Sequence, residues 1–195
     1  KFCQNIRLFW YKVNILAIIP ARGGSQRLRN KNIFPLWGKP MIYWAIQACK
    51  QSEFNIKVCV STESEEISKI SEEFGATIHK RDPELADHKT YKQAAIRSAA
   101  KWYEKSNGKQ DFFISLQANS PQVKNKDLDK AIESLLKYQK DEIFSVDSDL
   151  MQNAAFRIFR GDYVYQKDLS TNCGVHICEL HDVHTIEDIK FLENK

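Results

Sequence analysis

The chain has 195 residues, of which 43% are hydrophobic and 28% charged, with only 7 glycines and 5 prolines. This composition excludes collagen-like and low-complexity chains and predicts one globular domain with a well-buried core. The net charge of +4 is too small to indicate a nucleic-acid-binding protein, but it suits a protein whose ligand is a small polyanion. No apolar run approaches the ~20 residues that cross a bilayer, so we expect no membrane partner.

The first twelve residues, KFCQNIRLFWYK, carry charges that interrupt their apolar side chains, unlike the apolar core of a secretion signal. We therefore expect residues 1–12 to form an N-terminal arm and residues 13–195 a single domain. The five cysteines are an odd number for a disulfide framework, and Cys49 and Cys59 lie in apolar surroundings. These observations predict a reducing, cytoplasmic location.

Apolar runs and amphipathic stretches alternate along the chain. A continuous β-branched run at 14–20 predicts a strand buried on both faces. Thr62 precedes an acidic first turn of a helix that is expected to end at Gly75. Further strands are expected at 56–61, 76–79, 111–117 and 143–147, and further helices at 40–51, 89–105 and 125–139. This alternation predicts a three-layer, Rossmann-like α/β fold whose mostly parallel sheet carries helices on both faces.

The pattern weakens after residue 147. Short strands are expected at 156–159, 163–165 and 174–178, as antiparallel additions to the sheet. A closing helix is expected at 185–193, with Thr185 as its N-cap and Asp188 at its third position.

The loop after the first predicted strand combines adjacent glycines with positive charge. Ligands of open parallel sheets bind at the carboxyl ends of the strands, and adjacent glycines let backbone N–H groups approach an anion closely. This loop carries four cationic side chains in a stretch of ten residues, namely Arg22, Arg27, Arg29 and Lys31. The loop matches neither GxxxxGK[ST] nor GxGxxG. It predicts a polyphosphate ligand, and a solvated basic turn is the alternative interpretation.

This stretch resembles the opening of the acylneuraminate cytidylyltransferases, the CMP-sialic acid synthetase family with relatives for other sugar acids. The resemblance is carried by IIPARGGS at 18–25, RL at 27–28, NKNI at 30–33 and GKP at 38–40. It continues more loosely through 60–62, 81–86, 116–117, 120–121 and 182–189. Such enzymes join CTP to a sugar acid and release pyrophosphate. The resemblance therefore implies the nucleotide-diphospho-sugar transferase variant of this fold and a CMP-sugar synthetase activity.

The resemblance also implies roles for single residues. The implied catalytic residues are Arg22, Lys31 and Asp182, and Asp182 matches the first of two aspartates that hold Mg²⁺. Gln117 matches a glutamine that contacts the acceptor sugar. The implied nucleotide-binding residues are Ala21, Arg22, Gly23, Gly24, Ser25, Lys31, Asn32, Arg81 and, as a candidate, Thr90. A homodimer is implied as well.

Some positions depart from the family pattern. His184 stands where the second metal-binding aspartate is expected, and imidazole is a poor Mg²⁺ ligand, so Mn²⁺ is an alternative cofactor. Gln26 replaces a lysine and Glu63 an aspartate. Val123 replaces an arginine of a sugar-side motif, for which Lys124 is a candidate substitute. Two other functions therefore stay open: a same-fold nucleotidyltransferase with a different acceptor, and a non-catalytic nucleotide-binding homologue.

Overall fold

The structure, a computed structural model, describes residues 13–86, 92–168 and 170–194. The predicted N-terminal arm at 1–12 and the candidate nucleotide-binding residue Thr90 lie outside the described residues.

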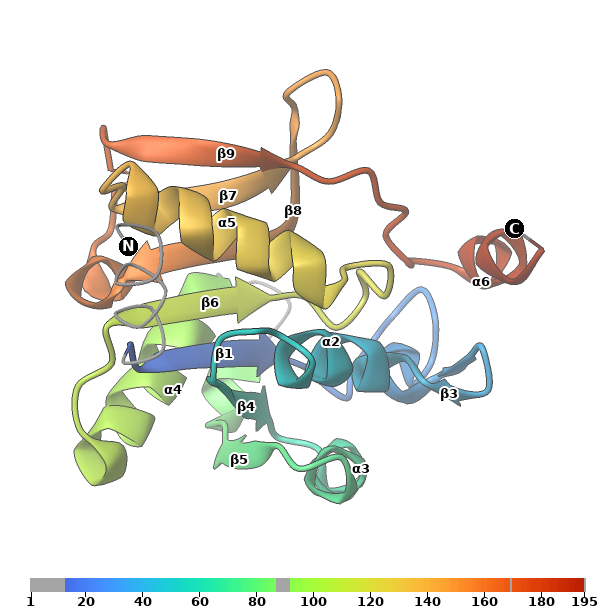
Figure 1. Cartoon of the computed structure of the whole chain (residues 1–195). Coiled ribbons are helices and arrows are strands. Elements are labelled where there is room, and N and C mark those ends of the chain that lie inside the picture. Colours follow the sequence, from blue (N-terminus) through green and yellow to red (C-terminus); the bar gives the residue numbers. More distant parts are fainter. Residues whose placement is uncertain (1–12, 87–91, 169, 195) are drawn as a thin grey trace.

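A seven-stranded sheet with the order β5-β4-β1-β6-β8-β7-β9 forms the middle layer of the fold (Figure 1). Its strands are β1 (Ile15–Pro20), β4 (Ile56–Thr62), β5 (Thr77–Lys80), β6 (Phe112–Leu116), β7 (Glu142–Val146), β8 (Gln152–Arg160) and β9 (Cys173–Ile177). β1 pairs in parallel with β4 and β6, and β4 pairs in parallel with β5. β8 is antiparallel to both β6 and β7. The prediction of a mostly parallel sheet is confirmed.

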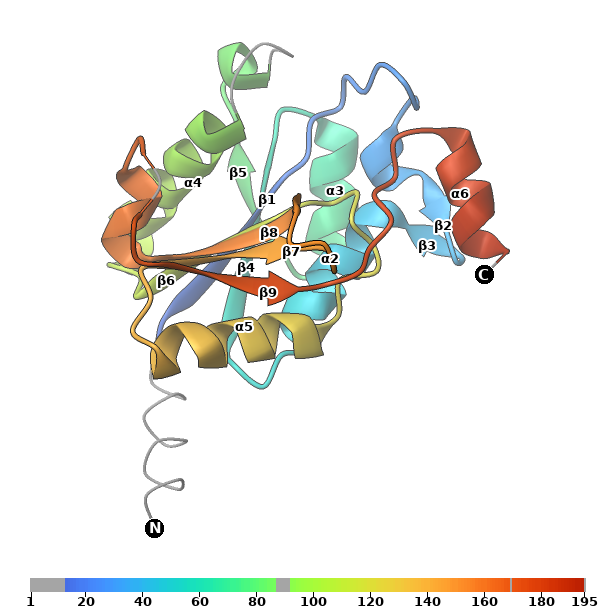
Figure 2. The same cartoon turned by 90° about the horizontal axis from the view of Figure 1, so that it is seen from above.

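Helices cover both faces of this sheet. They are α2 (Met41–Lys50), α3 (Glu65–Glu73), α4 (Lys92–Asn107), α5 (Asn125–Lys137) and α6 (Ile186–Glu193). Smaller elements are the 3-10 helices η1 (Lys31–Ile33), η2 (Pro83–Ala86) and η3 (Gly161–Tyr165) and a hairpin of β2 (Pro35–Leu36) and β3 (Lys39–Pro40). Figures 1 and 2 show α4 on one face of the sheet and α2 and α5 on the other. Among the described helices, none is long and apolar enough to cross a membrane.

β1 connects the two halves of the core because its side chains alternate between the faces of the sheet. Ile15, Ala17 and Ile19 belong to the cluster that α2, α3 and α5 complete. Leu16 and Ile18 belong to the cluster that α4 completes on the other face. All five side chains are fully buried, which confirms the prediction of a strand buried on both faces. The three-layer α/β fold follows from this arrangement.

The helix predicted to begin after Thr62 starts later than expected. Thr62 is still part of β4, where it pairs with Lys80 of β5. Ser64 is the N-cap of α3, and its hydroxyl accepts a hydrogen bond of 3.4 Å from the backbone N–H of Ile67. Glu63 therefore precedes the helix, and its carboxylate is free for contacts elsewhere.

Two predictions for the last third of the chain were wrong. The strand expected at 163–165 is part of η3, because the carbonyl of Val164 accepts hydrogen bonds from Gln93 and Arg97 of α4 and is drawn toward that helix. The strand expected at 174–178 exists as β9, but it is parallel to β7 rather than antiparallel. β9 lies beyond β7 at the edge of the sheet and does not neighbour β8, which runs in the opposite direction.

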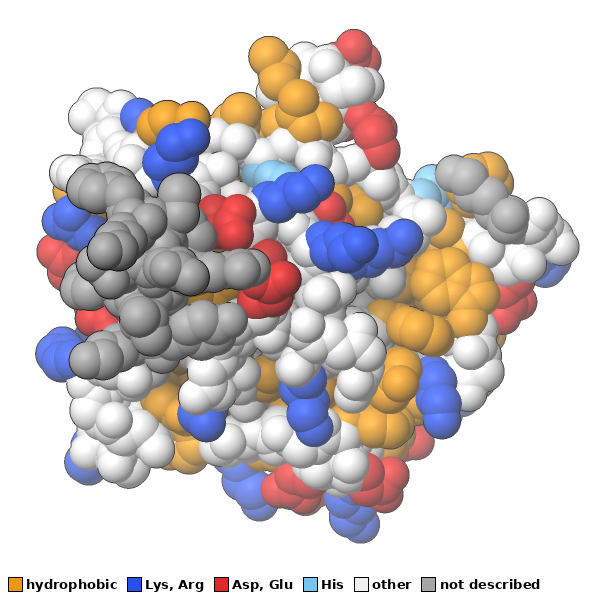
Figure 3. Space-filling model, viewed as in Figure 1, with side chains coloured by type: hydrophobic (Ala, Val, Ile, Leu, Met, Phe, Trp, Pro, Cys, Tyr) orange, Lys and Arg blue, Asp and Glu red, His pale blue; other side chains and the backbone are white. Residues whose placement is uncertain are grey.

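The last described helix, α6, packs against the β2–β3 hairpin. Val183, Ile189 and Leu192 share an apolar cluster with Leu28 and Met41. The indole N–H of Trp37 also donates a hydrogen bond of 3.1 Å to the carbonyl of Leu192. Figure 3 shows apolar side chains gathered where Figure 1 places β3 and α6. This packing brings the segment before α6 next to the loop that follows β1.

Candidate functional site

A pocket of about 330 Å³ lies beyond the carboxyl ends of β1, β5 and β6. Its lining comes from the loop after β1, from Arg81 after β5, from Gln117 and Asn119 after β6, and from α4 and His184. The described residues that line it include five cationic side chains and no acidic one; the cations are Arg22, Arg27, Lys31, Arg81 and Lys92. A pocket with this charge favours a polyanionic ligand.

The pocket brings together most of the residues predicted from the sequence. Six of them line it: Arg22, Ser25, Lys31, Asn32, Arg81 and Gln117. Ala21, Gly23, Gly24 and Asp182 do not contribute to the lining. The backbone N–H of Ala21 donates to the carbonyl of Ser61 at 3.0 Å and so extends the pairing of β1 with β4. Arg29, which was counted in the basic cluster, is exposed and lies outside the lining.

The loop after β1 is held in shape by its own polar groups. The amide of Asn32 donates a hydrogen bond of 2.9 Å to the carbonyl of Arg22, and the N–H of Ser25 donates to the carbonyl of Gly23 at 2.9 Å. Asn30 adopts a left-handed conformation with a φ of 53°, which asparagine tolerates better than most residues. This turn leads into η1 and places Lys31 in the pocket wall.

The electrostatics of the pocket centre on Lys31. Burial lowers the pKa of Lys31, the nearby charges of Arg27 and Arg22 lower it further, and Asp182 opposes the shift. Burial also lowers the pKa of His184, and the charges of Lys31 and Arg27 add to the effect. His184 is therefore neutral near pH 7, with its Nδ1 lying 3.4 Å from a guanidinium nitrogen of Arg27. An anion bound here would relieve the repulsion among these cations.

Asp182 reaches the site through contacts with the loop after β6. The hydroxyl of Ser120 donates a hydrogen bond of 2.5 Å to Asp182 Oδ1. The neighbouring residue Val183 exchanges two hydrogen bonds with Asn119: its N–H donates to the Asn119 carbonyl at 2.8 Å, and its carbonyl accepts from the Asn119 amide at 3.3 Å. These contacts hold the carboxylate near Lys31, whose pKa it influences.

Asp188 is committed to capping α6. Its Oδ2 accepts hydrogen bonds of 2.8 Å from the backbone N–H groups of both His184 and Thr185, and its Oδ1 lies 2.7 Å from His181 Nε2. The predicted pairing of Thr185 with Asp188 at the start of this helix is confirmed as a capping box. Among the described residues at this edge of the pocket, Asp182 is therefore the carboxylate that remains for a ligand.

The donor set allows only part of a metal site. No group of three or more histidine, cysteine or acidic side chains suited to a metal ion occurs within the described residues. Mg²⁺ in phosphate-transfer sites is nevertheless held by one or two carboxylates together with oxygens of the substrate. The single carboxylate of Asp182 fits this kind of site, in which the substrate supplies the remaining oxygens.

Sequence reasoning missed Lys92 and misplaced Lys124. Lys92, the first described residue of α4, lines the pocket, and its pKa is lowered, chiefly by the loss of solvent around the ammonium group. Lys124 instead lines a separate pocket beside Trp37 and Trp44. Val123, next to it, is buried in the core. Lys124 therefore does not supply a charge to this site. No local pattern in the sequence singles out Lys92, because its place in the pocket depends on how α4 packs against the sheet.

Gln117 is oriented by the antiparallel part of the sheet. Its amide Nε2 donates a hydrogen bond of 2.5 Å to the carbonyl of Ala154 in β8. Ala154 has a left-handed backbone conformation, with a φ of 59°. This hydrogen bond orients the side-chain amide, whose carbonyl oxygen can accept a hydrogen bond from a ligand.

Fold and site together define an α/β protein with a cationic, anion-binding pocket at the carboxyl edge of its sheet. The chain belongs to the cytidylyltransferase family, since the family model described as Cytidylyltransferase matches residues 16–191.

Two curated relatives illustrate the similarity. N-acylneuraminate cytidylyltransferase A of Danio rerio is 38% identical over 133 residues, which cover 68% of this chain and 30% of the relative. Pseudaminic acid cytidylyltransferase of Campylobacter jejuni (strain 81-176) is 30% identical over 155 residues, which cover 78% of this chain and 67% of the relative. The match therefore spans about 30% of the length of the Danio rerio protein.

Solved structures share the fold at low sequence identity. CMP:2-keto-3-deoxy-manno-octonic acid synthetase in complex with CTP superposes with a TM-score of 0.74 at 16% identity, covering 93% of this chain and 97% of that one. A cytidylyltransferase from Leptospira borgpetersenii gives a TM-score of 0.70 at 18% identity, covering 93% and 85%. These likenesses confirm the nucleotidyltransferase type of α/β fold.

Proposed function

We propose that the chain is a CMP-sugar synthetase that joins CTP to a sugar acid of the nonulosonic type and releases pyrophosphate. The observation that carries this proposal is the pocket at the carboxyl edge of the sheet. Arg22 and Arg27 of the loop after β1, and Lys31 directly after it, line this pocket together. The names of the curated relatives, which act on acylneuraminic and pseudaminic acids, support the choice of nucleotide and acceptor.

In the proposed reaction, the anomeric hydroxyl oxygen of the sugar attacks the α-phosphorus of CTP in line with the leaving pyrophosphate. A bond forms between this oxygen and the α-phosphorus, the bond from the α-phosphorus to the bridging oxygen breaks with its electron pair leaving on pyrophosphate, and the hydroxyl proton passes to solvent water. Such transfers depend mainly on positioning and on neutralising phosphate charge. Arg22 and Lys31 are positively charged and line the pocket, so they can neutralise the phosphates. Lys31 is the first residue of η1.

The acceptor would bind at the end of the pocket formed by α4 and the loop after β6. Gln117, whose amide is oriented by its hydrogen bond to the Ala154 carbonyl, offers a carbonyl oxygen to a sugar hydroxyl or amide N–H. Lys92 offers a positive charge to the carboxylate of the acid. Lys92 forms no ion pair with the other residues that the structure describes, so its charge is available to a ligand.

We propose that Asp182 holds Mg²⁺ together with phosphate oxygens of CTP. When bound, such an ion would supply positive charge to the phosphates and to the leaving pyrophosphate. Ser120 fixes the orientation of the carboxylate through its hydrogen bond to Oδ1. The neutral His184 does not add the second negative charge that the resemblance leads one to expect, so Mn²⁺ stays the alternative ion.

A cytoplasmic location and a homodimer also stay proposals. The four described cysteines, Cys49, Cys59, Cys173 and Cys178, are free thiols, as a reducing compartment favours.

The decisive experiment measures pyrophosphate release with CTP, Mg²⁺ or Mn²⁺ and a panel of sugar acids that includes acylneuraminic and pseudaminic acids. We expect release with CTP and at least one acid, and much less with ATP, GTP or UTP. Release that requires a phosphosugar or another acceptor would identify the same-fold alternative.

A non-catalytic role has one observation in its favour, the replacement of a metal-binding aspartate by His184. CTP binding without pyrophosphate release for any acceptor or metal would establish that role and refute the synthetase. Absence of both binding and release would refute both functions.

A further inference from the structure

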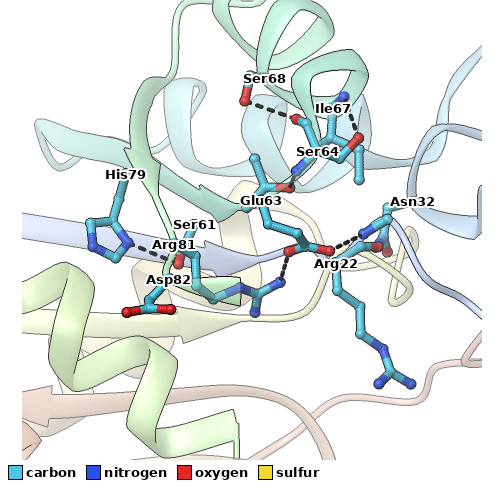
Figure 4. A network of polar contacts seen from close by, with 12 residues as sticks. Arg22, Asn32, Ser61, Glu63, Ser64, Ile67, Ser68, His79, Arg81 and Asp82 are labelled. Atoms are coloured by element: carbon cyan, nitrogen blue, oxygen red, sulfur yellow. Dashed lines mark hydrogen bonds and ion pairs between the residues drawn. The ribbon is translucent and has the colours of Figure 1, made fainter. Parts of the chain in front are cut away.

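Glu63 connects three neighbouring strands at the edge of the sheet where the pocket lies. Its Oε1 accepts a hydrogen bond of 2.8 Å from the backbone N–H of Gly23, in the loop after β1. Its Oε2 accepts a hydrogen bond of 2.6 Å from the guanidinium of Arg81, which follows β5. Glu63 itself follows β4. Figure 4 shows its carboxylate between Arg81 and the loop that begins at Arg22, whose own guanidinium points away from this network.

This carboxylate acts from behind the pocket wall. Arg81 lines the pocket, whereas neither Glu63 nor Gly23 does. The Arg81 side chain is only 5% exposed and that of Glu63 23%. Arg81 Nε is buried and has no hydrogen-bond partner within the part of the chain that the structure describes. Among the described residues, Glu63 is therefore the side chain whose hydrogen bond orients the Arg81 guanidinium.

Glu63 also fixes the position of the loop after β1, through its hydrogen bond from Gly23. A Cβ atom at Gly23 would lie 3.1 Å from Ser64 Cβ, so the glycine packs directly against the start of α3. The N–H of Gly23 is donated to Glu63, not to the interior of the pocket. Burial of Glu63 raises the pKa of its carboxyl, but the hydrogen bonds from Arg81 and Gly23 outweigh this effect and the pKa is lowered. Glu63 is therefore a carboxylate over the ordinary pH range.

We infer that Glu63 is a positioning residue for nucleotide binding, which aligns Arg81 and the loop after β1 while leaving the pocket itself to the ligand. The inference rests on the proposed function. It also changes the role of Gly23, which the resemblance placed among the residues that bind the nucleotide. Gly23 permits close packing on α3 and supplies the N–H that Glu63 holds.

The test compares CTP affinity, measured by calorimetric titration, for the unaltered chain and for Glu63→Gln. The amide of glutamine can still accept from Gly23, but it brings an NH₂ group against Arg81 in place of a carboxylate. Since hydrogen bonds to charged groups are stronger than neutral ones, we expect CTP affinity to fall roughly tenfold or more. The KM for CTP should rise in parallel, whereas the KM for the sugar acid should stay within about twofold, as for a site not in contact.

Glu65→Gln is the matched control. Glu65 lies two residues further along and pairs with Lys80, the neighbour of Arg81, at 3.2 Å, but both side chains are more than 70% exposed. We expect no change in CTP affinity for this variant, because exposed ion pairs contribute little. Glu63→Asp keeps the charge but is too short to span both partners, and we expect an intermediate affinity. It carries the test alone if Glu63→Gln does not fold.

A double-mutant cycle with Arg81→Gln separates positioning from general destabilisation. If Glu63 acts through Arg81, its substitution should matter less once Arg81 is absent. Unchanged CTP affinity in Glu63→Gln with a lower melting temperature would overturn the inference and leave a purely structural role. Tighter CTP binding would also overturn it, because Glu63 would then compete with the nucleotide. A chain that binds no CTP even unaltered refutes the proposed function, and the inference with it.

Discussion

The hydroxyl of Ser120 donates a hydrogen bond of 2.5 Å to Asp182 Oδ1, which joins two residues 62 positions apart in the chain. Ser120 follows β6, the strand between β1 and β8 in the sheet, whereas Asp182 lies in the segment between β9 and α6. The bond fixes one oxygen of the proposed metal-binding carboxylate to the rigid core of the sheet. The electrostatics of the pocket therefore depend on how two distant parts of the chain meet.

Asp182→Asn removes the negative charge but keeps an oxygen that accepts from Ser120. We expect kcat to fall about 10²–10³-fold, as for other single electrostatic groups in transition states, with little change in melting temperature. Ser120→Ala keeps the carboxylate and loses only its orientation, so we expect about a 10–100-fold loss in metal affinity or activity. Equal activity of Asp182→Asn and the unaltered chain in pyrophosphate release would exclude Asp182 from the reaction.

Lys31→Ala and Lys39→Ala form a second matched pair. Lys31 lies in the pocket wall, whereas Lys39 is an exposed residue of β3 whose Nζ lies 5.7 Å from the ring of Tyr43. We expect kcat/KM to fall in Lys31→Ala by an amount equivalent to ~2.7–4 kcal/mol of transition-state stabilisation. Lys39→Ala should change it by no more than about 0.5 kcal/mol. Similar steady-state values for the two variants would refute the assignment of Lys31.

Lys92→Gln and Lys124→Gln test where the acidic acceptor binds. Of these two lysines, Lys92 lines the cationic pocket, whereas Lys124 lines the separate pocket beside Trp37. Loss of one charge-assisted contact is worth about 1.5–3 kcal/mol, so we expect the KM for the sugar acid to rise about tenfold or more in Lys92→Gln. The KM for CTP should change much less. A larger effect on CTP would place Lys92 on the phosphates instead, and any comparable effect of Lys124→Gln would contradict the site.

Asp188 predicts how stability depends on pH. Burial raises the pKa of its carboxyl, but hydrogen bonds from His184, His181 and Thr185 outweigh burial and hold the pKa far below its usual range. A carboxyl whose pKa is depressed by folding stabilises the protein above its unfolded pKa of about 3.9, and this contribution is lost progressively as the pH falls below that value. The free energy of unfolding, measured by urea denaturation, should therefore decline below about pH 4.

Asp188→Asn supplies the comparison for this effect. The variant should be less stable than the unaltered chain at pH 7, by about 1 kcal/mol for a lost cap. The difference between the two proteins should shrink as the pH approaches 3. Parallel curves across the whole range would show that Asp188 is not the group responsible.

Most of the layered fold could be predicted from periodicity, because β1 carries apolar side chains on both faces and the helices show a single apolar stripe. The pairing of β9 with β7 could not be predicted, because the short run that forms it has no local signal for its neighbour or direction. Thr62 and Glu63 illustrate the same limit. Acidic residues after a threonine are typical of a helix start, yet here Thr62 stays in the sheet and Glu63 turns toward Gly23.

The candidate site also has parts that the sequence could predict and parts that it could not. The cations of the loop after β1 could be recognised because they are adjacent in the sequence. Lys92 and the Glu63–Arg81 contact depend on strands and helices meeting in space, for which one sequence holds no pattern. Lys124 is next to the position of the missing arginine in the sequence, but it is the N-cap of α5 and lines another pocket.

The docking of α6 onto the β2–β3 hairpin relates to the order in which the parts of the site are synthesised. A protein chain is synthesised from its N-terminus, so β1, β4, β5 and β6, whose carboxyl ends lie beside the basic loop, are made well before Asp182. Asp182 is synthesised later and is held by Ser120, and the helix that follows it packs through Ile189 and Leu192 on the cluster that contains Leu28 and Met41. A nascent chain halted before Asp182 would therefore contain the basic loop after β1 without the carboxylate that lies near Lys31.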